Sequence, residues 1–206
     1  MKPYLSAMAL LGLTACGGSD SSDTAPVEPT TPDMVISQCY NFETTMGDFV
    51  VGIDNVNMPI TSENFSRYVD EGFYNNTIFH RIVNNFVNQG GGFSADLDKK
   101  ATHGPIKNES SVGLKNEYGT IAMARTQVLD SATSQFFINI SDNDDLDYPN
   151  QGGYAVFGKV VAGMEVVDMM NAVNTTNKTF KDGFIYSNVP VENIVVTQVS
   201  DISCPD

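Results

Sequence analysis

Short stretches in which apolar and polar residues alternate dominate the chain from about residue 40 onward, and this pattern predicts β-strands. Gly47 separates the first two stretches, as in a β-hairpin. Residues 93–118 and 174–190 are mostly polar and are predicted to be loops. The predicted strands cover residues 41–46, 48–53, 78–83, 86–89, 120–124, 134–140, 154–161 and 194–199.

Two further segments have the period of an amphipathic helix. One begins near Pro59, which suits the first turn of a helix, and ends near Gly72, which suits its C-terminal stop. Phe65 and Tyr68 share its apolar face. The other helix is expected within residues 163–173. Many short strands, few helices and no βαβ rhythm predict an all-β domain, either an antiparallel barrel or a sandwich.

The first fifteen residues are predicted to be a signal peptide. Lys2 supplies the early positive charge, and the apolar core at residues 4–13 is too short to span a bilayer. Leu13, Thr14 and Ala15 then precede Cys16. This arrangement resembles the lipobox of bacterial lipoproteins, whereas the alternative is an ordinary signal peptide cut nearby.

The lipobox resemblance implies cleavage before Cys16 and a lipid on its sulfur. Gly17 then favours the outer membrane, so the expected location is the bacterial cell envelope, on its periplasmic side. Residues 17–37 are rich in Ser, Thr, Asp and Pro and have little apolar surface to bury, so a disordered tether is expected. The predicted division is therefore 1–15 signal peptide, 16–37 lipidated cysteine and tether, and 38–206 one folded domain.

The formal net charge is -14. Such a balance argues against nucleic acid as a partner, because that affinity depends on Lys and Arg neutralising phosphates. It argues equally against docking of the protein surface on anionic lipid, so membrane contact is expected only through the lipid on Cys16. No heptad pattern indicates a dedicated oligomer interface, and a monomer is expected.

Cys39 and Cys204 are the two cysteines left when Cys16 is assigned to lipid. An even remainder in an exported chain predicts one disulfide, which would join the two ends of the domain. The alternative is two unrelated thiols.

An arginine, Arg81, lies within an apolar run that is predicted to be a strand, although charged residues are rarely buried without a partner. It belongs to the first of five sequence blocks that occur in order: FYNNTIFHRIVNNFVNQGG, GPIKNE, GTIAMAR, SQFFINI and YAVFGKVVAGMEVVD. Together these blocks resemble the cyclophilin-type peptidyl-prolyl isomerases, especially their bacterial branch. The resemblance implies an eight-stranded antiparallel β-barrel capped by two α-helices, a shallow groove for a proline-containing peptide, and no cofactor.

The implied reaction is rotation about an X–Pro bond, whose barrier is roughly 18–20 kcal/mol because resonance gives the C–N bond double-bond character. In the twisted amide the proline nitrogen regains a lone pair and accepts a hydrogen bond. A fixed cationic donor aimed at that nitrogen therefore stabilises the transition state. The expected partners are proline-containing polypeptides, including unfolded envelope proteins.

By resemblance, Arg81 is the catalytic arginine. Gln89 orients it, and Ala124 and Arg125 hold the peptide through backbone groups. His80 is placed next to the arginine, where a structural role is an equal alternative. The full set of implied substrate contacts is His80, Phe86, Val87, Gln89, Ala124, Arg125, Gln135, Phe137, Leu146 and Tyr154.

Asp145 departs from the family pattern, since animal members often have a tryptophan there. This departure is the sequence feature that favours the rival function, a peptide-binding module or chaperone with little catalysis. A structural lipoprotein with a degenerate groove is a weaker alternative. Gly90, Gly91 and Gly92 are expected to form a turn rather than a phosphate loop. The acidic residues at 142–147 are expected to form a solvated loop rather than a calcium site, and no metal site is predicted.

Overall fold

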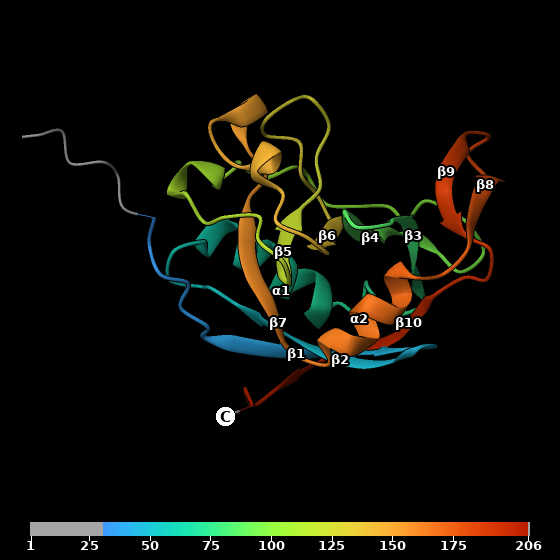
Figure 1. Cartoon of the computed structure of the whole chain (residues 1–206), viewed down its shortest axis with the longest axis horizontal. Helices are drawn as coiled ribbons and strands as arrows, with labels where there is room; N and C mark the ends of the chain where they lie inside the picture. The colour runs from blue at the N-terminus through green and yellow to red at the C-terminus, as the bar shows by residue number, and fades with distance from the viewer. Residues whose placement is uncertain (1–30, 206) are drawn as a thin grey trace, which may run out of the picture. The chain divides into compact units, whose positions relative to one another are not determined.

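Eight strands close into an antiparallel barrel in the computed structural model, which describes residues 31–205 (Figure 1). Their order around the barrel is β1-β10-β3-β4-β6-β5-β7-β2. The barrel implied by the family resemblance is thus confirmed, and the sandwich is excluded. The strands are β1 (Gln38–Thr44), β2 (Gly47–Ile53), β3 (Thr77–Val83), β4 (Val87–Ser94), β5 (Thr120–Met123), β6 (Phe136–Asn139), β7 (Val156–Ala162) and β10 (Val195–Ile202).

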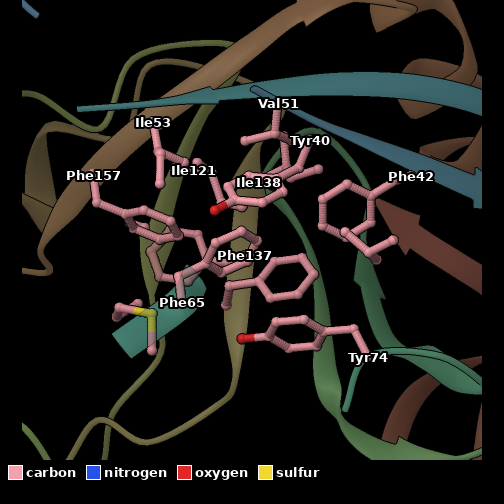
Figure 2. Packing of buried hydrophobic residues seen from close by; sticks show 14 of the residues in the cluster. Tyr40, Phe42, Val51, Ile53, Phe65, Tyr74, Ile121, Phe137, Ile138 and Phe157 are labelled. Carbon is pink, nitrogen blue, oxygen red and sulfur yellow. The ribbon is translucent and has the colours of Figure 1, made fainter. Parts of the chain in front are cut away.

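Aromatic rings fill the barrel interior. Phe65 lies at the centre of this cluster, with its ring centroid 5.2 Å from that of Tyr74 and 5.2 Å from that of Phe157. Phe42 and Phe49, which face each other across β1 and β2, stack at 4.9 Å. Figure 2 shows the rings of Phe42, Phe65 and Phe157 gathered between the strands. Because such a core is closely packed, the strands that bear the functional side chains are held rigidly.

Two helices, α1 (Pro59–Asp70) and α2 (Met164–Asn171), cover the barrel where the pattern predicted helices. Phe65 and Tyr68 of α1 are fully buried. Gly72 has a φ of 62° and follows the last turn of α1, as predicted for a C-terminal stop. No helix within residues 31–205 is both long enough and apolar enough to cross a membrane.

The segment 174–190, predicted to be a loop, forms a hairpin of β8 (Thr175–Thr179) and β9 (Ile185–Pro190) beside the barrel (Figure 1). The prediction was wrong because every residue of β8 is polar, so the strand shows no alternation. The hairpin is held instead by a small apolar cluster that it shares with β3 and β4. This second cluster consists of Ile78, Phe93, Phe180 and Val189.

Gly90, Gly91 and Gly92 lie within β4 and do not form the predicted turn. Gly91 has a φ of 79°, which favours glycine. A Cβ atom on Gly92 would lie 2.5 Å from Nε2 of Gln135. The glycines therefore leave room for the side chain of Gln135 beside the strand.

The ordered contacts of the domain begin before the predicted boundary at residue 38. The Val35 N–H donates to Oδ2 of Asp54 at 2.9 Å, and the Ser37 N–H donates to the Ile53 carbonyl at 3.0 Å. The end of the predicted tether thus packs along β2. The predicted signal peptide and the lipidation of Cys16 lie outside the described residues.

Cys39 in β1 and Cys204, which follows β10, form a disulfide with an S–S distance of 2.02 Å. β1 and β10 are the first and last barrel strands along the chain, and they pair with each other, with Cys39 opposite Ile202. The bridge therefore links the two ends of the domain at the place where the barrel closes.

Candidate active site

A cavity of about 180 Å³ lies where β3, β4 and β6 face the loops that follow β5 and precede β7. We call Arg81, Val87, Gln89 and Phe137 the strand wall, and Ala124, Arg125, Leu146 and Tyr154 the loop wall. Phe86, in the turn between β3 and β4, completes the lining. All nine of these residues belong to the set implied by the family resemblance. The structure thus brings together residues that are far apart in the sequence.

Arg81 reaches the cavity through an irregularity in the pairing of β3 with β4. Phe79, two residues earlier, packs in the main core, and the register shifts between Phe79 and Arg81. Strict alternation would place both side chains on one face. Bulges of this kind often redirect a side chain next to an active site.

The guanidinium of Arg81 is held by a short chain of side-chain hydrogen bonds. Its Nη1 donates to Oε1 of Gln89 at 3.3 Å, and Nε2 of Gln89 donates to Oε1 of Gln135 at 3.0 Å. Burial lowers the pKa of Arg81 below its usual value, but an arginine guanidinium is not deprotonated in proteins and keeps its charge at neutral pH. The site therefore contains a fixed, half-buried cation.

The apolar part of the cavity is built from aromatic and aliphatic side chains. The ring of Phe137 meets that of Tyr154 edge-on, with centroids 5.7 Å apart. Phe136, its neighbour in β6, packs in the main core, as alternation along the strand predicts. The carbonyl of Phe86 accepts hydrogen bonds from the Ile140 N–H at 2.9 Å and from Nδ2 of Asn143 at 3.1 Å. These bonds fix the turn that carries Phe86.

A second cavity, of about 320 Å³, adjoins the first and shares Gln89, Ala124 and Arg125 with it. Gln135 lines this second cavity rather than the first. Because they share these three lining residues, the two cavities form one continuous groove.

His80 does not line either cavity, so its predicted contact with substrate is not found. The side chain is only 3% exposed, and its ring packs against Phe93 with centroids 4.8 Å apart. Burial lowers the pKa of His80 to about 4, and the charge of Arg81 acts in the same direction. His80 is therefore a neutral imidazole packed behind the groove, a position that suits the structural alternative.

Asp145 is exposed and lines neither cavity, although its neighbour Leu146 belongs to the loop wall. Asp147, in the same acidic run, is buried and accepts hydrogen bonds from the backbone N–H and side chain of Asn116 at 2.7 and 3.0 Å. Part of this run thus anchors the loop. Within residues 31–205, no group of three or more His, Cys, Asp or Glu residues is arranged to hold a metal ion.

A larger cavity, of about 560 Å³, lies between the β1–β2 turn, the end of α2 and the β9–β10 connection. Among the described residues that line it, Glu192 alone is titratable. The smaller cavity is the better candidate because it combines a fixed cation with an apolar socket.

The comparison with known proteins identifies the family of the chain. The model of the family described as "Cyclophilin type peptidyl-prolyl cis-trans isomerase/CLD" matches residues 39–200. The chain belongs to the cyclophilin-type peptidyl-prolyl cis-trans isomerases. It is thus an enzyme of this class, and the matched region spans nearly the whole barrel.

Bacterial cyclophilins resemble this one closely over the barrel. Peptidyl-prolyl cis-trans isomerase A of Dickeya dadantii (strain 3937) is 51% identical over 154 residues, which cover 74% of this chain and 78% of that protein. Peptidyl-prolyl cis-trans isomerase B of Escherichia coli (strain K12) is 47% identical over 163 residues, covering 77% and 96%.

A solved cyclophilin from Cryptosporidium parvum has the same fold. Its crystal structure matches with a TM-score of 0.66 at 26% identity, covering 82% of this chain and 99% of that one. A second crystal structure of that protein, determined in the presence of the dipeptide Ala-Pro, matches with a TM-score of 0.66 at 25% identity, covering 81% and 100%.

One structural feature of the groove was missed in the sequence. Arg125 was expected to act through its backbone, but its side chain bonds to the carbonyls of Gln151 and Gly153. No local pattern could have indicated this, because the partners lie more than twenty residues further along the chain.

Proposed function

We propose that this cyclophilin isomerises X–Pro bonds by directing the Arg81 guanidinium at the proline nitrogen of the twisted amide. The planar amide nitrogen is a poor acceptor, so the donor acts mainly on the transition state. No covalent bond is made or broken, and no cofactor is needed. Phe86, Phe137 and Leu146 offer an apolar socket for the proline ring.

The observation that carries this assignment is the difference between the two arginines that border the cavity. Arg125 makes four hydrogen bonds to backbone carbonyls, using all three of its nitrogens. Within residues 31–205, the Arg81 side chain makes one hydrogen bond, in which Nη1 donates to Oε1 of Gln89 at 3.3 Å. Since a guanidinium has five N–H donors, Arg81 keeps donors available for a substrate.

Substrate binding by the groove is supported by its continuity and by the related Cryptosporidium cyclophilin, whose structure was determined in the presence of the dipeptide Ala-Pro. Asp145, which favoured the rival function of a binding module, lies outside the cavity lining. No feature of the groove within residues 31–205 therefore favours a non-catalytic role over catalysis.

The test is the rate of cis-to-trans isomerisation of a short X–Pro peptide by the wild type and by Arg81→Ala. Removing one preorganised donor typically costs about 10²- to 10³-fold in kcat, and we expect a loss of that size. Circular dichroism and thermal unfolding check that the variant folds. Equal rates in the two folded proteins would refute the role of Arg81, and a wild type without catalysis would favour the binding module.

We further propose that the enzyme is lipidated on Cys16 and assists the folding of proline-containing envelope proteins. The Cys39–Cys204 bridge supports export, because disulfides persist in oxidising compartments. The full chain should incorporate radiolabelled palmitate and fractionate with outer membranes. Cys16→Ser should abolish the label; a labelled Cys16→Ser protein would contradict the assignment.

A further inference from the structure

We propose that Arg125 is a positioning residue for catalysis, whose side chain fixes the loop wall of the groove by holding the backbone of residues 151–153 and the ring of Tyr154. This inference rests on the proposed use of the groove as the substrate site. It concerns a side chain that contributes through its neighbours rather than through the reacting amide.

The guanidinium of Arg125 bonds to the loop backbone with an almost complete set of donors. Nε and Nη2 donate to the Gly153 carbonyl at 3.0 and 2.9 Å, and Nη2 also donates to the Gln151 carbonyl at 2.7 Å. Nη1 donates to the Thr126 carbonyl at 2.9 Å. The planar fork thus ties the loop before β7 to the segment after β5.

The loop needs such support because of its backbone conformation. Gln151, Gly152 and Gly153 have φ values of 49°, 80° and 69°, three consecutive positive values. A non-glycine residue such as Gln151 is disfavoured there and is held by surrounding contacts. Arg125 supplies hydrogen bonds to two of the three carbonyls, those of Gln151 and Gly153.

The same loop is also held by two other residues. Nδ2 of Asn108 donates to the carbonyls of Gly152 and Gly153 at 3.1 Å each, and Oγ of Ser110 donates to the Gly152 carbonyl at 2.6 Å. Neither residue lines the cavity. Asn108 therefore offers a matched control: it anchors the same backbone without contact to the groove.

Of these three anchoring side chains, Arg125 is the one that connects the loop to the substrate socket. Its Cζ lies 4.4 Å from the centroid of the Tyr154 ring, within the range of a cation–π interaction. Tyr154 in turn meets Phe137 edge-on across the cavity. Fixing the Tyr154 ring therefore sets the width of the socket between the loop wall and the strand wall. Figure 1 shows the loops on either side of β6 rising together above the barrel.

A positioning role predicts an effect on substrate binding rather than on the chemical step. When Arg125 is lost, the loop and the Tyr154 ring gain conformations that do not fit the proline ring, and part of the binding energy is used to restore the fit. Arg81 and its bond to Gln89 stay unchanged. KM should therefore rise while kcat is conserved.

The test is steady-state kinetics of the full domain on an X–Pro peptide, at concentrations that span KM. For Arg125→Ala we expect KM to rise about fivefold or more, with kcat within about twofold of the wild type. Arg125→Lys should recover only part of KM, because an ammonium can lie over the Tyr154 ring but lacks the planar fork that makes four hydrogen bonds at once. Asn108→Ala is the control, and its thermal stability is compared with that of Arg125→Ala. Its KM should change by less than about twofold.

Three outcomes would overturn the proposal: a fall in kcat at unchanged KM, equal KM values for Arg125→Ala and Asn108→Ala, or a wild-type KM for Arg125→Lys. If Arg125→Ala does not fold, the lysine variant alone decides. Failure here is distinguishable from failure of the proposed function, which depends on wild-type catalysis and on Arg81→Ala.

Discussion

The strand wall and the loop wall enclose one groove with different physical means. The strand wall comes from β3, β4 and β6, which pair in the barrel and pack on its aromatic core. The loop wall comes from segments outside the strands, where side chains such as Arg125 and Asn116 bind backbone carbonyls and neighbouring side chains. Each wall contributes one arginine. Within residues 31–205, Arg81 of the strand wall makes one side-chain hydrogen bond, whereas Arg125 of the loop wall makes four.

This difference shows how one residue type can take two roles in one site. On a rigid wall, an arginine with free donors is available to the reacting group. On a wall without strands, an arginine uses its donors to order the backbone and leaves few for a substrate. Changes at Arg81 in the strand wall should therefore alter kcat, and changes at Arg125 in the loop wall should alter KM.

The largest effect is expected from His80, behind the strand wall. Its folded pKa of about 4 lies below the unfolded value of about 6.5, so the unfolded chain binds the proton more readily. The resulting stability, about 3 kcal/mol, is present above about pH 6.5 and is lost as the pH falls to about 4. In His80→Gln this loss should vanish. Urea unfolding of both proteins at about pH 7.5 and about pH 4.5 measures the difference; parallel losses would contradict the prediction.

Arg81→Lys should separate the two arginines sharply. The ammonium keeps the charge but loses the planar fork, so kcat should fall about 10²-fold, or about 2.7 kcal/mol, at nearly unchanged KM. Arg125→Lys should show the reverse. Kinetics of the two lysine variants on one peptide, measured side by side, provide the comparison. Similar kcat values for both would mean that the walls do not differ as described.

Gly153→Ala tests the backbone of the loop wall. The new Cβ would lie 2.7 Å from the Tyr148 nitrogen, and the φ of 69° disfavours alanine, so we expect a loss of about 2 kcal/mol in unfolding free energy. KM should rise as well. Gly104→Ala is the control, because no atom lies within 4 Å of the added Cβ. Equal stability of the two variants would show that the loop adapts freely.

The smallest effect is expected for Val87→Met, in the strand wall. The family resemblance allows methionine at this position, and the cavity of about 180 Å³ is open to the groove. The change in KM should stay below about threefold, with less than about 1.5 kcal/mol lost in stability. A tenfold change would mean that the strand wall fits the proline ring more tightly than its cavity suggests.

Much of the barrel could be predicted from local patterns. Alternation located all eight barrel strands, and the helical period located α1 and α2. The β8–β9 hairpin was missed because its strands are mostly polar and pack through few side chains, such as Phe180 and Val189. Gly90 to Gly92 were misassigned because glycine in a strand and glycine in a turn look alike without the neighbouring strand.

The site was predictable by another route. Block order and spacing identified Arg81 and its companions through the family resemblance, and nine of those residues line one cavity. The placement of His80 behind the groove was not predictable, because the register shift between Phe79 and Arg81 breaks strict alternation at this point.

The sequence by itself determined the eight barrel strands and the two helices, because these depend on local periodicity, and its resemblance to the family supplied the group of residues that a proline groove requires. Only the tertiary structure decided which of the two arginines keeps free donors. That choice depends on carbonyls at residues 151 and 153, which reach Arg125 only when the loop before β7 folds back over β5. Hydrogen bonds between distant segments form only once the barrel has brought the segments together, so no local sequence pattern predicts them.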